Sequence, residues 1–149
     1  MWVQVFKISF SLIPKPKGRP RFTKKGFAFT PAATRKAERD IAAIISEQVN
    51  GRKPIDNAIR VEMEIIMPRP KSHFGTGNNS GKIKGSSPMF PTTKPDIDNL
   101  EKAFLDAAEG ILWVNDSRIV QKETYLWYAD ECAPGYNIVV EEWKNDNAT

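Results

Sequence analysis

The sequence predicts an α+β fold, a single domain in which a mixed β-sheet carries two helices. The chain has 149 residues, the size of one ordinary domain, and 40% of them are hydrophobic, which is enough for a sizeable core. Segments with the alternation of strands and segments with the spacing of amphipathic helices follow in the order β, hairpin, α, β, α, β, β. No repeat or boundary interrupts this order, so we assign residues 1–149 to one domain.

The chain begins with an expected strand at residues 2–10, where Gln4 is the exception on an otherwise apolar side. That side carries Trp2, Phe6, Ile8 and Phe10. Proline and glycine then break up a basic, aromatic-dotted segment. We expect a hairpin there, turning at the sequence KKG of residues 24–26.

A helix is expected next, from about residue 31 or 34 to residue 49, because apolar residues recur there at helical spacing. Thr30 or Thr34 can cap its start, and the sequence NG at residues 50–51 ends it. The alternation of apolar and charged residues at 59–67 then predicts a half-buried strand.

Residues 68–95 have no periodicity and are rich in proline, glycine, serine and lysine. A loop this long in a compact domain tends to be functional or disordered, so we expect a basic loop that can move. A second helix follows and ends at Gly110. Strands at residues 119–129 and 136–143 complete the domain. The buried stripe of the second helix comprises Leu100, Ala103, Phe104, Ala107 and Ile111.

Composition excludes several classes of protein. One cysteine, Cys132, and one histidine, His73, exclude an intrachain disulfide and a Cys/His zinc cluster. No apolar run approaches the roughly 18 residues of a membrane span, and the alternating start is unlike a signal peptide. Phosphate-loop, zinc-protease and serine-hydrolase motifs are missing as well. We therefore expect a soluble, cytoplasmic protein with no membrane partner and no small-molecule cofactor.

Charge is unevenly distributed along the chain, although the net charge is only +4. Residues 1–37 carry nine lysines or arginines and no acid, and residues 68–95 carry five and again no acid. From Glu101 onward there are ten acidic residues and four basic residues. Such segregation suggests a polyanion bound along part of the surface, although solvated lysine-rich loops are an alternative explanation.

Two carboxylates, Asp96 and Asp98, lie one residue apart just before the second helix. Capping explains part of this pattern: with Asp98 as N-cap, Glu101 lies at N3 and Lys102 pairs with Asp98 across one turn. Asp96 is then unexplained. In an extended segment both acids point to the same side, and such a pair persists more easily with a cation between them.

A third carboxylate, Asp116, follows the second helix, which carries the chain roughly 18 Å away from Asp98. It meets the pair only if the chain returns along the helix, which the sequence permits but does not require. Oxygen ligands without histidine or cysteine suit Mg²⁺ or Mn²⁺, and a basic surface around them indicates phosphodiester hydrolysis in nucleic acid. Lys102 would add a fixed positive charge near the scissile phosphate. Capping plus an unrelated surface aspartate is the alternative.

The sequence KPDIDNLEKAFLDAAEGILWVNDSRIV, residues 94–120, resembles the signature of the RusA family of Holliday junction resolvases. Upstream, KGRPRFTKKGFAFTPAATRKAE is similar to the N-terminal motif of phage and prophage members of that family. The resemblance covers roughly residues 12–128. It implies a RusA-like fold and a homodimer that cuts four-way DNA junctions by paired, Mg²⁺-dependent nicks. Such an enzyme acts in DNA recombination and repair, in a bacterial or phage-infected cell.

By position, the resemblance implies that Asp96, Asp98 and Asp116 bind the metal and, with Lys102, form the catalytic set. The resemblance also implies a structural role for Asp106 on the helix. There are two departures from the family pattern. Asn115 stands where many members have an aspartate, and the loop at residues 68–95 is long for the family.

Basic residues of the two acid-free segments are the candidates for contact with DNA phosphates. They are Lys15, Lys17, Arg19, Arg21, Lys24, Lys25, Lys71, Lys82, Lys84 and Lys94. Those of the loop could close over DNA as a flap or simply be solvated. Among the interleaved aromatics, one ring could stack at the junction, but we favour core positions for Phe27 and Phe29.

Two rival functions stay open. One is a Mg²⁺-dependent nuclease for other branched DNA, such as flaps or replication forks. The other is a branched-DNA-binding protein without catalysis.

Overall fold

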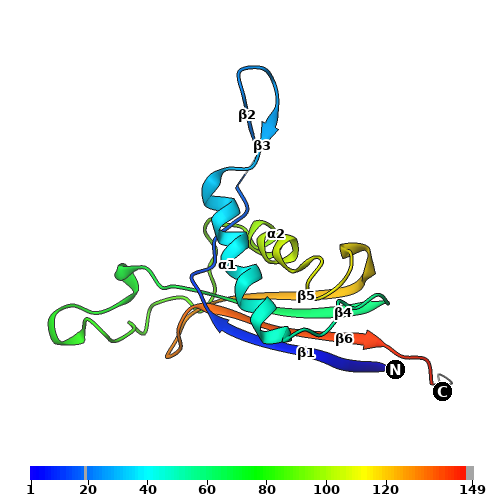
Figure 1. Ribbon diagram of the computed structural model, residues 1–149. Helices are drawn as coiled ribbons and strands as arrows, with labels where there is room; N and C mark the ends of the chain where they lie inside the picture. Colours follow the sequence, from blue (N-terminus) through cyan, green and yellow to red (C-terminus); the bar gives the residue numbers. More distant parts are fainter. Residues whose placement is uncertain (19, 147–149) are drawn as a thin grey trace.

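The structure is a computed structural model that describes residues 1–18 and 20–146. Its main sheet has the strand order β1 (Trp2–Ser11), β6 (Gly135–Trp143), β4 (Ile59–Met67) and β5 (Ile119–Tyr128). The β6 strand is antiparallel to β1 and β4, whereas β4 and β5 are parallel. Helices α1 (Ala32–Val49) and α2 (Ile97–Ala108) cover one face, and the other face is open (Figure 1). The predicted α+β fold with a mixed sheet and two helices is confirmed.

The covered face of the sheet follows from the alternation along its strands. In β4, Ile59, Val61, Met63 and Ile65 are at most 2% exposed and pack against the helices, while the residues between them are polar or only partly buried. The core also takes in Ile41 and Ile45 of α1, Leu100 and Phe104 of α2, and Phe6, Ile8, Tyr136, Ile138 and Val140 of β1 and β6. No helix in the described ranges is both long and apolar enough to cross a membrane.

The first strand departs from the expected alternation. Its register against β6 shifts between Gln4 and Phe6, which is a β-bulge. Trp2 consequently lies on the open face, where the guanidinium carbon of Arg60 stands 5.1 Å from the centre of its ring. The expectation that Trp2 shares a side with Phe6 is therefore wrong, because a bulge reverses the facing of the residues before it.

The expected hairpin is present as a separate two-stranded sheet of β2 (Arg21–Phe22) and β3 (Ala28–Phe29). It projects from the helix-covered side of the molecule, next to the start of α1 (Figure 1). Phe27 and Phe29 are 69% and 45% exposed, so the expected core positions for these two rings are wrong. The reason is that the hairpin has no second layer to pack against.

The long loop at residues 68–95 extends past the end of the sheet (Figure 1). It contains two short 3₁₀ turns, Lys71–His73 and Gly77–Asn79, and an antiparallel bridge between Phe74 and Ile83. Arg69, at the start of the loop, is bonded to the end of β5 and to a later part of the loop, since Nε donates to the Ala129 carbonyl and Nη1 to the Pro88 carbonyl, both at 2.7 Å. Local hydrogen bonds thus give the loop a defined path, and its closure over DNA stays a prediction.

The α2 helix is the crossover between the parallel strands β4 and β5. Gly110, with φ of 84°, adopts the left-handed conformation that turns the chain after α2. The β5 strand then returns along the helix, where Lys122 and Thr124 both contact the Glu101 carboxylate. The return of the chain along α2, which the sequence only permitted, is therefore observed.

Candidate active site at the two ends of α2

The predicted carboxylate pair lies at the start of α2. Asp96 is the N-cap residue, its backbone is extended, and its side chain makes no capping hydrogen bond. Asp98 lies in the first helical turn, so the expectation that Asp98 is the N-cap is wrong by two residues. Both side chains are exposed, which leaves both carboxylates accessible to a cation.

Lys102 lies one turn further along the same helix and is exposed. Residues four apart are neighbours on one helix face, so Lys102 and Asp98 share a face. The beginning of α2 therefore presents two carboxylates and one ammonium group to solvent.

Asp116 is fixed at the other end of α2. Trp113 Nε1 donates to its Oδ1 at 2.7 Å, and its backbone N donates to Glu109 Oε2 at 2.9 Å. Trp113 is fully buried. Burial raises the pKa of the Asp116 carboxyl group, the hydrogen bond from Trp113 opposes this rise, and the nearby Glu109 and Asp106 add to it.

The length of α2 separates the third acid from the pair. Its 12 residues span roughly 18 Å, with Asp96 at one end and Asp116 beyond the other. Among residues 1–18 and 20–146, no group of three or more acidic, histidine or cysteine side chains is arranged to hold a metal. One chain thus brings together Asp96, Asp98 and Lys102, and it leaves Asp116 apart.

An aromatic groove lies directly beside the pair. It has a volume of about 480 Å³ between residues 90–97 and strand β5, and Asp96 is part of its lining. Phe90 and Tyr125 flank Trp127, with ring centroids 5.3 and 5.9 Å from the Trp127 ring. This groove was not predicted from the sequence. The sequence pattern that could have predicted the groove is the spacing of Tyr125 and Trp127, which places both rings on the same side of a strand.

Lys17 joins the two helices. Its Nζ contacts the Asp106 carboxylate of α2 and Glu38 Oε1 of α1, the latter at 3.2 Å, and all three side chains are at least 70% buried. The hydrogen bond to Asp106 is the main cause that raises the pKa of Lys17. Lys17 is thus engaged inside the protein, in place of the phosphate contact that we expected. The expected structural role of Asp106 agrees with this contact.

The other predicted DNA-contacting residues are exposed on two projections. The hairpin and its base carry Lys15, Arg21, Lys24 and Lys25. The long loop carries Lys71, Lys82, Lys84 and Lys94. Arg19 lies outside the described residues. His73, which had no predicted role, contacts Tyr128 edge to face within the loop base.

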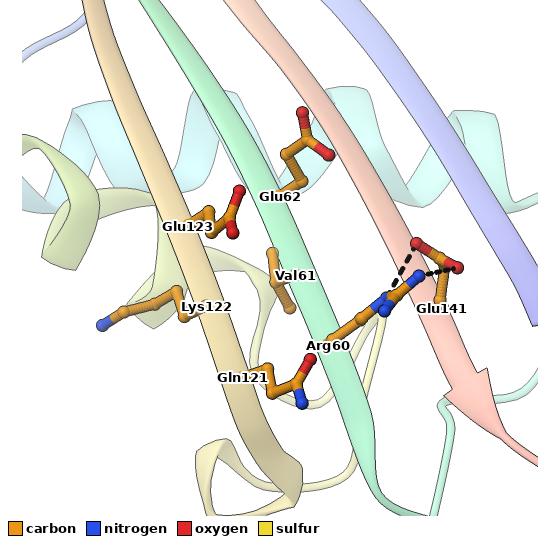
Figure 2. A pocket seen from close by; sticks show the side chains of 7 residues that line it. All are labelled: Arg60, Val61, Glu62, Gln121, Lys122, Glu123 and Glu141. Carbon is orange, nitrogen blue, oxygen red and sulfur yellow. Dashed lines mark hydrogen bonds and ion pairs between the residues drawn. The ribbon is translucent and has the colours of Figure 1, made fainter. Parts of the chain in front are cut away.

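The open face of the sheet has the opposite character. This face has a hollow of about 530 Å³. Glu62, Glu123 and Glu141 line it from three neighbouring strands (Figure 2). Arg60 binds Glu141 through two hydrogen bonds of 2.9 and 3.0 Å, which neutralises one of these acids. The remaining negative charge disfavours a polyanion on this face. The helix-covered side, which carries the hairpin, is the better surface for DNA.

The chain is similar to known proteins over most of its length. The model of the endodeoxyribonuclease RusA family matches residues 12–141. The chain belongs to the RusA family. Membership of this family implies an endonuclease of the Holliday junction resolvase type, a class that acts on branched DNA and is typically metal-dependent. The protein YqaN of Bacillus subtilis (strain 168), described as uncharacterized, is 27% identical over 139 residues, which cover 91% of this chain and 96% of YqaN.

Proposed function

We propose that this chain is a Mg²⁺-dependent endonuclease that resolves four-way DNA junctions by paired, symmetric nicks in recombination and repair. The observation that carries the proposal is the exposed pair of Asp96 and Asp98, with Lys102 one turn away, within the motif of the RusA family. The basic hairpin on the same side of the sheet supports DNA as the substrate.

The donor chemistry of the pair fits Mg²⁺, with Mn²⁺ as a substitute. Mg²⁺ is commonly held by one or two carboxylates together with water and substrate phosphate, and Asp96 and Asp98 offer two exposed carboxylates. When bound, the metal supplies an activated water and stabilises negative charge on the phosphate. Lys102 then places a positive charge beside the scissile phosphate. Lys94, which is close to Asp96 in the sequence, would contact a phosphate of the same DNA strand.

Asp116 remains a proposed third ligand. Because α2 separates it from the pair, a site with all three carboxylates needs a second copy of the chain or a rearrangement of residues 109–118. A homodimer is also required by the reaction, since two strands of like polarity are cut and each chain has one catalytic set. We therefore propose a two-fold dimer as the active form.

The hairpin and the long loop provide the proposed phosphate contacts. Lys15, Arg21, Lys24 and Lys25 are exposed on the first, and the four lysines of the loop are exposed on the second. Arg19 stays among the proposed phosphate contacts because it lies in the same basic segment of the sequence. Lys17 is left out because its ammonium group is already engaged by two carboxylates.

The test compares purified protein on a four-way junction, a flap, a fork and a linear duplex, each with Mg²⁺ and with a chelator. We expect Mg²⁺-dependent nicks at symmetric positions in two opposing strands of the junction. Faster cutting of flaps or forks would favour the nuclease for other branched DNA. Tight junction binding without cutting in any metal would favour the binding protein.

A further inference from the structure

The hairpin of β2 and β3 has a defined tip. Thr23 N donates to the Phe27 carbonyl at 2.8 Å, Gly26 N donates to the Thr23 carbonyl at 2.9 Å, and Phe27 N donates to Thr23 Oγ1 at 3.1 Å. Gly26 has φ of 85°, a conformation that favours glycine. The turn is therefore specified by its own hydrogen bonds and needs no support from the rest of the protein.

Two phenylalanine rings flank this turn, and both are exposed to solvent. Phe22 is 71% and Phe27 is 69% exposed. Phe22 lies opposite Ala28 in the hairpin, and Phe27 precedes Ala28 in the chain. Since successive residues of an extended segment point to opposite faces, Phe22 and Phe27 project from opposite faces of the hairpin. One ring is available on each side.

The charge around these rings favours a nucleic acid over an apolar partner. Lys24 and Lys25 lie in the turn between the two rings, Arg21 lies at the base of the hairpin, and no acid occurs in residues 1–37. Lysine and arginine bind phosphates, and aromatic rings stack on any base whose face is accessible. Inside a duplex these faces are covered by neighbouring pairs. At the branch point of a junction, the last base pair of each arm has a face that an inserted side chain can reach.

The base of the hairpin is attached close to the carboxylate pair. Lys17 N donates to the carbonyl of Asn99, the residue after Asp98, at 3.0 Å, and Gly18 N donates to Thr34 Oγ1 at 3.0 Å. Phe22 follows Lys17 by five residues, so its backbone lies within roughly 18 Å of the Lys17 backbone. With the 3.0 Å hydrogen bond added, it lies within roughly 21 Å of the Asn99 carbonyl. That distance corresponds to about six nucleotide steps of 3.4 Å.

We propose that the hairpin, residues 21–29, is a wedge for the branch point, with Phe22 and Phe27 each stacked on a base pair that borders it. This inference rests on the proposed function, because it takes branched DNA as the substrate. It identifies the hairpin as the part of the protein that distinguishes a junction from a duplex. It also limits the nicks to within about six nucleotides of the branch point.

The experiment measures binding by fluorescence of 2-aminopurine placed in the base pairs that border the branch point. All proteins carry Asp98→Asn so that the DNA stays intact. The double variant Phe22→Leu/Phe27→Leu keeps apolar side chains but removes both rings, and Phe29→Leu, at the base of the hairpin, is the matched control. Thermal unfolding and sedimentation are measured for each variant.

We expect the double variant to lose the change in 2-aminopurine fluorescence and to bind the junction about 100-fold more weakly, about tenfold for each ring. Its affinity for linear duplex should stay within about twofold, and the Phe29→Leu control should behave like the parent. An unchanged junction affinity, an equal loss on duplex, a failure to fold, or an altered sedimentation coefficient would each overturn the wedge. If the parent protein itself does not prefer junction to duplex, the proposed function fails together with the inference.

Discussion

Trp113 Nε1 donates a 2.7 Å hydrogen bond to Oδ1 of Asp116, so a fully buried ring orients a partly exposed carboxylate. Trp113→Phe retains most of the buried apolar surface but removes the donor. We expect a loss of about 1.5–3 kcal/mol in the free energy of unfolding, the usual range for a hydrogen bond to a charged group. Denaturant unfolding measures this loss. Trp143→Phe, which removes the bond to Asn145 at an exposed position, should cost far less.

Asp98→Asn should separate binding from cutting. The substitution removes one negative charge from the carboxylate pair, and it costs the helix only the favourable dipole interaction, about 0.3–1 kcal/mol. Cleavage should fall by about 1,000-fold or more, which corresponds to roughly 4 kcal/mol of lost metal chemistry. Junction affinity should hold or rise, because one charge that repels phosphate is gone. Asp130→Asn, an exposed acid far along the chain, should leave cleavage unchanged, and near-normal cutting by Asp98→Asn would rule out this metal site.

Asp116 gives a test of the shared site. In a dimer where the pair of one chain is completed by Asp116 of the other, mixing Asp98→Asn with Asp116→Asn chains creates one intact site in every mixed dimer. We expect each variant alone to be inactive and the refolded mixture to nick one strand of the junction. Gel analysis distinguishes single from paired nicks. An inactive mixture, with mixed dimers verified by mass, would mean that each chain uses its own Asp116.

Lys17→Met should destabilise the protein by roughly 1.5–3 kcal/mol, because Glu38 and Asp106 would then face each other without a cation. Lys36→Met is the matched control: its pair with Asp40 is exposed, and its loss should cost less than about 1 kcal/mol. The folded pKa of Lys17 is raised, so its contribution is fully present below the unfolded lysine value of about 10.4 and is lost as the pH rises through the folded value. Unfolding curves of the variant and the wild type should therefore converge in strong alkali.

Lys24→Ala/Lys25→Ala should weaken binding to all DNA alike. If each lysine makes one phosphate contact, the slope of log affinity against log salt should become shallower by about 1.8. The comparison is Lys7→Ala, whose side chain is exposed on β1 near Glu62 and Glu64 on the open face. An unchanged slope in the double variant would remove the hairpin from the phosphate contacts.

The order of the elements could be predicted from the sequence, because each has a strong period and a clear end. The strand at residues 59–67 alternates from Ile59 to Ile65, and α2 ends shortly before Gly110. The bulge that moves Trp2 to the open face could not be predicted from its own strand, since it is set by pairing with β6. The exposure of Phe27 and Phe29 was missed for a related reason: burial depends on whether a second layer is present.

Only part of the candidate site could be predicted from the sequence. The sequence placed Asp96, Asp98 and Lys102 together, because they share one local element. The ion pairs of Lys17 and the groove around Trp127 join segments far apart in the chain, and no local pattern encodes such contacts. The position of Asp116 depends on where the turn after α2 ends, which the sequence did not determine.

The strand order also constrains how the protein can be made. The β6 strand comes last in the chain, yet it lies between β1 and β4 and pairs with both. While a ribosome is still synthesising the earlier segments, β1 has no partner and β4 has only β5. Pairing of distant segments is slow, and unpaired strand edges are prone to aggregate. The protein therefore cannot complete its sheet until β6 has emerged, and a chain that stops short of it should be unable to fold.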